Sequence, residues 1–242
     1  MSSRGFYGSD TSGILGRLVL EYVGTFLLVL VGTKAAVDAA ASLSIAGSPT
    51  GSVGVALAFG ATLGILVYAL GVRTGCHLNP AVTLAAMVGR SIGVLQGLLY
   101  MSVQIIGGVS ASLMLSTLVS PGVRSETRLG LTTLAAGYNP VHLIIVEAVA
   151  TGILVLVVLF VAVSGRVHEA ASGVAIGGAL FAGIIFAGSI TGGALNPART
   201  IGPMVVENAY GNVWGYLFAQ FLGAVVAALL FKVVGRVKQP NV

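Results

Sequence analysis

The tripeptides Asn79-Pro80-Ala81 and Asn196-Pro197-Ala198 hold two side-chain amides that can donate hydrogen bonds to a polar molecule. Asparagine is favoured immediately before a helix and proline at its first position, so each tripeptide predicts a helix start. As a cap, the asparagine oxygen accepts from its own helix backbone, which leaves the NH2 group free to donate. Each helix start also carries about half a positive charge, which repels cations but not neutral molecules.

The composition places these groups in a membrane protein. Of the 242 residues, 56% are apolar and 8% are charged, whereas a soluble chain has about 25% charged residues. The 35 glycines suit closely packed membrane helices, and a single cysteine excludes an internal disulfide. The net charge of +5 does not indicate a nucleic-acid partner, because the charges cluster at loops. We expect one integral membrane domain over residues 1–242.

Six apolar segments are long enough to cross a bilayer, which takes about 20 residues. They cover approximately Leu15–Val37, Gly51–Val72, Gly93–Val119, Val141–Ser164, Ala170–Ser189 and Val213–Val234. The helices expected at Asn79–Val88 and Asn196–Val206 are about 15 Å long, half the thickness of a hydrocarbon core of about 30 Å. Each is therefore predicted to be a half-helix on a re-entrant loop.

The two halves of the chain repeat the same markers in the same order. The matched pairs are Glu21 with Glu147, Gly54 with Gly173, Asn79 with Asn196, and Gln104 with Gln220. Each half has three spans, an odd number, so the second half must be inverted in the membrane and the half-helices enter from opposite faces. We predict an all-α membrane fold with a 3+3 inverted repeat: residues 1–119, an outer connecting loop at 120–140, and residues 141–242.

Basic residues predict the orientation, because cytoplasmic loops carry an excess of lysine and arginine. An inside N-terminus puts eight of them on the cytoplasmic side and three outside: Arg4, Arg17, Arg73, Arg90, Arg166, Lys232, Arg236 and Lys238, against Lys34, Arg124 and Arg128. Both termini are therefore expected in the cytoplasm, with the chain in the plasma membrane. Within the connecting loop, Arg124, Glu126 and Arg128 are expected to be solvated.

Glu21 and Glu147 are acids inside predicted spans, and a proton relay is one interpretation of such residues. Their symmetric placement favours a scaffold role, in which each carboxylate accepts backbone N–H bonds from an irregular re-entrant loop. Gln104 and Gln220 are expected to support the same loops.

The segments before each asparagine are rich in small residues, so their backbone can approach a cavity. Their carbonyls are predicted to form a line of acceptors for a single file of molecules, from Gly75, Cys76, His77, Gly192 and Ala194. The ring of His77 fits structural packing as well as solute contact. Arg199, three residues after Asn196, is expected to face an aqueous cavity, although its side chain can instead extend to the outer interface.

The chain strongly resembles the aquaporin or major intrinsic protein family over nearly its whole length. The resemblance is carried by the motifs Gly75–Thr83 and Gly193–Thr200, by the six spans and by the paired glutamates. The resemblance implies a bundle of six tilted helices, an hourglass pore in each subunit and a homotetramer. By position, it also implies a selectivity constriction formed by Phe59, Ile184, Gly193 and Arg199.

At this constriction the chain departs from strictly water-selective members, which carry histidine where Ile184 stands. Ile184 and Gly193 predict a wider, more apolar opening, similar to that of some microbial and plant vacuolar members. Glycerol facilitators typically carry aspartate where this chain has Thr200. Water is the first expected solute, and the alternatives are glycerol or other small polyols, ammonia, carbon dioxide and hydrogen sulfide.

Two other classes stay open, a secondary transporter and a structural membrane protein with a closed pore. Transporters generally need ion sites or a coupling carboxylate near the midplane, where this chain offers neutral asparagines. The sequence has no metal-ligand cluster, nucleophile–base pair or phosphate loop, so we expect neither an enzyme nor a cofactor.

Overall fold

Six long apolar helices form the protein in a computed structural model that describes residues 13–45, 48–163 and 169–234. They are α1 (Ile14–Ala40), α2 (Gly51–Thr74), α4 (Val94–Leu118), α6 (Pro140–Val158), α7 (Glu169–Thr191) and α9 (Val213–Val234). A π-helical turn, Leu159–Val163, prolongs α6. The six predicted spans are confirmed, and their ends differ from the expected ones by at most three residues.

The outer surface of the bundle is apolar, whereas its interior holds small and polar residues among buried apolar ones. On α1, the exposed side chains recur every four residues: Leu15, Val19, Val23, Leu27 and Val31. The opposite face of α1 buries Glu21, Gly24, Thr25 and Gly32. Residues four apart share one face of a helix, so the apolar stripe of α1 faces outward, where lipid replaces water as the solvent.

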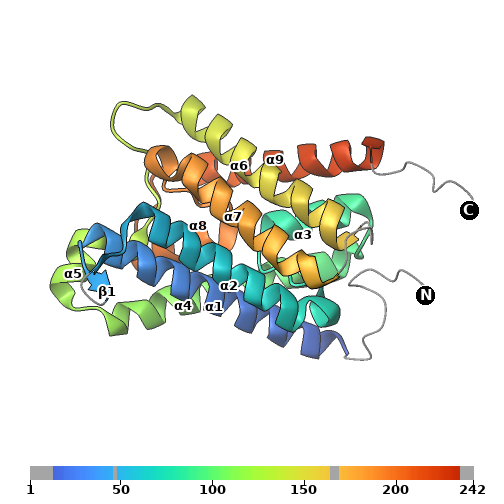
Figure 1. Cartoon of the computed structure of the whole chain (residues 1–242), viewed down its shortest axis with the longest axis horizontal. Coiled ribbons are helices and arrows are strands. Elements are labelled where there is room, and N and C mark those ends of the chain that lie inside the picture. Colours follow the sequence, from blue (N-terminus) through green and yellow to red (C-terminus); the bar gives the residue numbers. More distant parts are fainter. Residues whose placement is uncertain (1–12, 46–47, 164–168, 235–242) are drawn as a thin grey trace, which may run out of the picture.

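The two predicted half-helices are α3 (Pro80–Gly89) and α8 (Pro197–Val206). They lie toward opposite ends of the bundle, which confirms that they enter from opposite faces (Figure 1). Each half-helix contacts the last span of the other half: α3 packs on α9, and α8 packs on α4. The two halves of the repeat are therefore interlocked.

Helix α2 packs along α7, its counterpart in the repeat. Glycines allow this close approach, since a methyl group on Gly60 would lie 2.7 Å from the carbonyl oxygen of Gly177. Similarly, a methyl group on Gly64 would lie 2.8 Å from the carbonyl oxygen of Gly173. The small residues therefore fix the contact between the two halves.

The connections on one end of the bundle hold more structure than predicted. A short antiparallel pair, β1 (Ser44–Ile45) and β2 (Ser48–Pro49), lies between α1 and α2. The segment expected to be a plain loop contains α5 (Pro121–Thr127) and a 3-10 turn, Arg128–Gly130.

The expectation that Arg124 is solvated holds only in part: its side chain is 38% exposed, but its Nε donates to Oε1 of Glu207 at 2.8 Å. The partner lies 83 residues away, so local sequence could not reveal the pair. Glu126 and Arg128 are exposed, as expected. The start of α1 and the end of α9 lie at the same end of the bundle (Figure 1), whereas the termini themselves fall outside the described residues.

Candidate functional site

Asn79 and Asn196 cap the two half-helices. Their backbones are extended, with φ of −158° and −152°, and their Oδ1 atoms accept from the N–H groups of Ala81 at 2.8 Å and Ala198 at 2.9 Å. The predicted helix starts are thus confirmed, including proline at the first helical position. Both positive helix ends point toward the middle of the bundle.

The amide groups of the two asparagines are not wholly free, which corrects the expectation from sequence. Nδ2 of Asn79 donates to the carbonyl of Leu195 at 2.8 Å, and Nδ2 of Asn196 donates to the carbonyl of Leu78 at 2.9 Å. The left-handed backbone of Leu78 (φ 49°) and Leu195 (φ 53°) directs these chain segments toward each other. An NH2 group has two hydrogens, so each asparagine keeps one donor for a passing molecule.

Both asparagines line a narrow cavity of about 20 Å³, close to the space of one water molecule. Its polar lining comes from Asn79, Asn196, Arg199 and His77. The other walls are mostly apolar: Leu28, Phe59, Leu63, Cys76, Val82, Leu154, Val158, Ile176, Leu180 and Ala194. A cavity of this volume holds about one small molecule and offers it polar contacts along only part of its wall.

A second, wider cavity of about 640 Å³ lies beside the first, and Arg199 lines both. Its lining includes Ile184, Gly192, Thr132 and Thr127. Because α5, the ends of α1 and α7 and the start of α2 surround it, this cavity is a vestibule at the end of the bundle that carries α8. The wide vestibule therefore narrows at Arg199.

Arg199 is buried, with 3% of its surface exposed, and its Nη2 donates to the carbonyl of Gly130 at 2.8 Å. Its guanidinium carbon lies 5.5 Å from the centre of the Phe59 ring, within range of a cation–π contact. Among the described residues, Nε and Nη1 of Arg199 have no hydrogen-bond partner. Buried donors without a protein partner are costly unless a small polar molecule reaches them.

The other residues expected at the constriction surround the same place. Phe59 lines the narrow cavity, and Ile184 lines the vestibule. A methyl group on Gly193 would lie 3.2 Å from Cα of Ile184, so these two positions are in contact. Arg199 thus contacts Phe59, and Ile184 contacts Gly193, with Arg199 lining both cavities and Gly193 lining neither.

The residues expected to supply carbonyl acceptors are divided between the cavities. Cys76, His77 and Ala194 line the narrow one, Gly192 lines the vestibule, and Gly75 lines neither. Nδ1 of His77 lies 3.1 Å from Oγ1 of Thr83, and the His77 ring packs edge-on against Tyr100. His77 therefore has packing contacts on one side and borders the passage on the other.

Glu21 is fully buried and accepts four hydrogen bonds. Its Oε1 accepts from Oγ1 of Thr74 at 2.7 Å and from the N–H of His77 at 3.0 Å. Its Oε2 accepts from the N–H of Leu78 at 2.8 Å and from Nε2 of Gln104 at 2.7 Å. The carboxylate thereby satisfies two backbone donors of the loop before α3.

Glu147 makes the equivalent set of contacts in the second half. Its Oε1 accepts from Oγ1 of Thr191 at 2.6 Å and from the N–H of Ala194 at 2.9 Å. Its Oε2 accepts from the N–H of Leu195 at 2.9 Å and from Nε2 of Gln220 at 3.1 Å. Neither Glu21 nor Glu147 lines either cavity, which is an unfavourable position for a proton relay.

Two buried tyrosines also support the loops and were not predicted from the sequence. The Tyr100 hydroxyl donates to the carbonyl of Thr74 at 3.1 Å, and the Tyr216 hydroxyl donates to the carbonyl of Thr191 at 2.6 Å. Both tyrosines are fully buried and stand four residues before Gln104 and Gln220. A comparison of the two halves four residues before the matched glutamines would have identified this tyrosine pair.

Comparison with known proteins agrees with this geometry. Residues 9–231 match the family model described as Major intrinsic protein. The chain is 34% identical to glycerol uptake facilitator protein-like 6 of Lactiplantibacillus plantarum, over 90% of this chain and 98% of that protein. It is 31% identical to aquaporin Z of Rhodopseudomonas palustris, over 90% and 92%.

The fold is shared with the aquaglyceroporin from Plasmodium falciparum, solved by X-ray crystallography. The TM-score is 0.80 at 22% identity, with 93% of this chain and 98% of that chain covered. A match over most of the chain, together with the two facing half-helices, shows that the chain belongs to the major intrinsic protein family.

Proposed function

We propose that the chain forms a passive transmembrane channel that conducts water and small neutral solutes and excludes ions and protons. The observation that carries this proposal is the meeting of two capped half-helix starts, Asn79 and Asn196, at a cavity whose volume is close to that of one water molecule. Their positive ends repel cations at this cavity, and a neutral molecule meets no such barrier. Membership in a family of channels, and not of enzymes, supports the same function.

Proton exclusion follows from the asparagine donors. The hydrogen that each Nδ2 keeps after bonding Leu195 or Leu78 is available to the oxygen of a passing water molecule. A water held through its oxygen by both asparagines directs its own hydrogens away from them. The chain of hydrogen bonds along which a proton could hop is interrupted at that molecule.

Selection among neutral solutes is assigned to Phe59, Ile184, Gly193 and Arg199. Nε and Nη1 of Arg199 supply donors to a solute oxygen, while Phe59 and Ile184 supply apolar walls. We assign water as the main solute, because the narrow cavity has room for about one water. Glycerol is the second candidate, supported by the apolar Ile184 and by the relative named as a glycerol uptake facilitator. Other small polyols, ammonia and dissolved gases are further candidates.

The buried acids are assigned a scaffold role. Glu21 and Glu147 hold the irregular loops before the two asparagines, with Gln104 and Gln220 orienting the carboxylates. Backbone donors at membrane depth have no water to bond, so a carboxylate acceptor stabilises the loop.

The chain is a multi-pass integral membrane protein. We assign both termini to the cytoplasm and the protein to the plasma membrane, supported by the excess of basic residues on that side. A homotetramer is the assembly that the family resemblance implies. It predicts that chemical cross-linking in membranes yields products up to four chains and none larger.

Light scattering from proteoliposomes tests the proposed function. Under an osmotic gradient, we expect fast water flux with a low activation energy, and no proton leak when a pH gradient is applied. Glycerol flux is measured on the same vesicles to rank the two solutes. Water flux equal to that of empty liposomes, or saturating flux coupled to an ion gradient, would contradict the channel.

A further inference from the structure

The segment that joins the two halves contacts α8 at two places. At the far end of α8, Arg124 Nε donates to Glu207 Oε1 at 2.8 Å, and its Nη2 reaches the carbonyl of Val206 at 3.4 Å. Near the start of α8, the carbonyl of Gly130 accepts from Nη2 of Arg199 at 2.8 Å. One short stretch of chain, from Arg124 to Gly130, therefore spans from the end of the half-helix to the constriction.

Between these two contacts the backbone is strained. Arg128, Leu129 and Gly130 have positive φ in succession, at 48°, 54° and 68°. Left-handed backbone is unfavourable for residues with a side chain and persists only where surrounding contacts hold it in place. The position of the Gly130 carbonyl therefore depends on what holds this turn.

Packing holds one side of the turn. Leu129 is fully buried in a cluster with Val37 and Leu115, against which Val123 and Val206 pack. Gly130 lies against α1, where a methyl group on it would be 3.1 Å from the carbonyl oxygen of Thr33. These contacts fix the turn against α1 and α4, but the charged link to α8 is the Arg124–Glu207 pair.

We propose that Arg124 and Glu207 form a clamp between α5 and α8 that positions Arg199 and so sets the solute selectivity of the constriction. This inference rests on the proposed function, in which Arg199 selects among solutes. Among the described residues, the Gly130 carbonyl is the hydrogen-bond acceptor of Arg199, whose Nε and Nη1 are buried without a partner, and the residue itself lines the narrow cavity. A shift of α5 relative to α8 moves that carbonyl, and Arg199 follows it and widens the opening.

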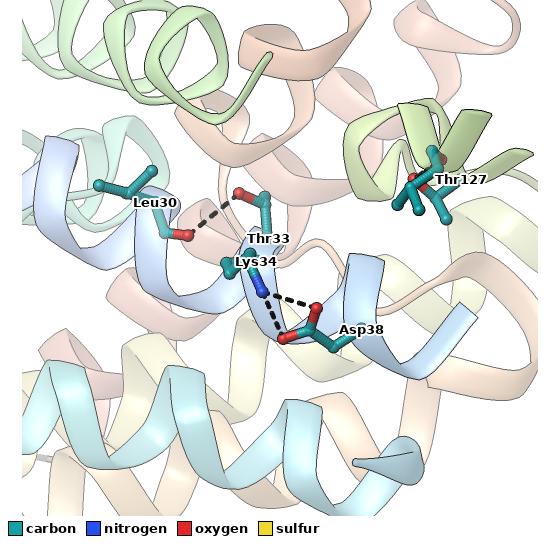
Figure 2. Close-up of polar contacts among 6 residues, drawn as sticks. Leu30, Thr33, Lys34, Asp38 and Thr127 are labelled. Atoms are coloured by element: carbon teal, nitrogen blue, oxygen red, sulfur yellow. Dashed lines mark hydrogen bonds and ion pairs between the residues drawn. The ribbon is translucent and has the colours of Figure 1, made fainter. Parts of the chain in front are cut away.

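A second ion pair provides a matched control. Nζ of Lys34 lies 2.6 Å from Oδ1 of Asp38, and both residues belong to α1 (Figure 2). The Lys34 and Arg124 side chains are similarly exposed, at 42% and 38%. The Lys34–Asp38 pair joins neighbouring turns of one helix and holds no second element against α8. Removing it changes surface charge without loosening the clamp.

The test measures glycerol and water permeability of Arg124→Gln and Glu207→Gln in proteoliposomes. We expect the ratio of glycerol to water permeability to rise about twofold to fivefold in each variant, the factor corresponding to the coupling of a partly exposed ion pair. The double variant should rise no further than either single one, because the pair is broken already. Exchanging the charges, with Arg124→Glu and Glu207→Arg together, should return the ratio toward that of the parent. Lys34→Gln should leave it unchanged.

Arg199→Val is measured in parallel, so that the two levels of inference can fail separately. If Arg199→Val leaves the ratio unchanged, the role of Arg199 in the proposed function is wrong. If Arg199→Val raises the ratio but neither Arg124→Gln nor Glu207→Gln does, the clamp is wrong and the constriction stands. An equal rise in Lys34→Gln also overturns the clamp. Should Arg124→Gln fail to fold, Glu207→Gln and the charge exchange decide the matter.

Discussion

The two re-entrant loops share one supporting network but line the passage with different residues. In both, a buried glutamate, a threonine, a glutamine and a tyrosine hold the loop through matching hydrogen bonds. Three residues after the asparagine, however, the first loop carries Val82 and the second carries Arg199. Before the asparagine, the first has Cys76 and His77 where the second has Gly193 and Ala194. A symmetric scaffold thus supports an asymmetric passage, with its charged constriction at one end only.

The largest effect is expected from substitution of the buried glutamates that support the two loops. Glu21→Ala and Glu147→Ala each leave two backbone donors buried without their acceptor and remove one acceptor from a threonine and a glutamine, so we expect a loss of about 3–5 kcal/mol in the free energy of unfolding. Thermal unfolding in detergent measures this loss. Glu126→Ala, on the exposed surface, is the control and should unfold like the parent. A large loss for one glutamate and none for the other would break the proposed symmetry of support.

The next largest effect is expected from removal of the Arg199 charge, which the first loop lacks at the matching position. Arg199→Val should raise the ratio of glycerol to water permeability by at least about tenfold, because the roughly 1.5–3 kcal/mol of a hydrogen bond to a charged group corresponds to a factor of about 10 to 150. Proteoliposome light scattering gives both permeabilities. Val82→Ala, at the matching position of the first loop, should leave the ratio near that of the parent. Equal changes in the two variants would show that both ends of the passage select solutes.

A smaller effect comes from the apolar wall of the constriction. Ile184→His adds a polar group beside Gly193, and we expect it to lower glycerol permeability relative to water about fivefold, because pockets discriminate modestly by shape. The same flux measurements apply. Phe186→His, at an exposed position of α7 that lines neither cavity, serves as the control. An unchanged ratio for Ile184→His would place the selecting wall elsewhere.

The smallest effect concerns the tyrosines. Tyr100→Phe and Tyr216→Phe each remove one hydrogen bond to a loop carbonyl, so we expect each to lower the free energy of unfolding by about 1 kcal/mol. Water permeability should stay near the parent value, because neither tyrosine lines the cavities. Thermal unfolding in detergent checks the expected loss of stability, and light scattering from proteoliposomes checks the water permeability. A loss of water flux in only one variant would mean that the two networks support the passage unequally.

Much of the fold was predictable because it depends on short-range patterns and on the repeat. Span lengths follow from apolar runs, the starts of α3 and α8 follow from asparagine and proline, and inversion follows from three spans in each half. The glutamate pair was predictable because the repeat displays it twice. The tyrosine pair was equally visible in the repeat and was missed.

Other features of the site involve residues far apart in the chain, which no local pattern connects. The bonds from Asn79 to Leu195 and from Asn196 to Leu78 cross 116 and 118 residues. The Arg124–Glu207 pair crosses 83, and it lies in a segment that composition alone suggests is solvated. Such contacts exist only once both halves have packed.

By itself, the sequence determined a membrane protein with six spans, two opposed half-helices and buried acids at matched positions. Hydropathy, helix-capping residues and repetition depend on neighbouring residues or on the order of motifs, so they can be recognised in the sequence without knowledge of the fold. Only the tertiary structure decided how much of each asparagine is free, where the passage narrows and what holds Arg199. Those depend on distances between α1, α2, α5, α7 and α8, which are set by the packing of the whole bundle.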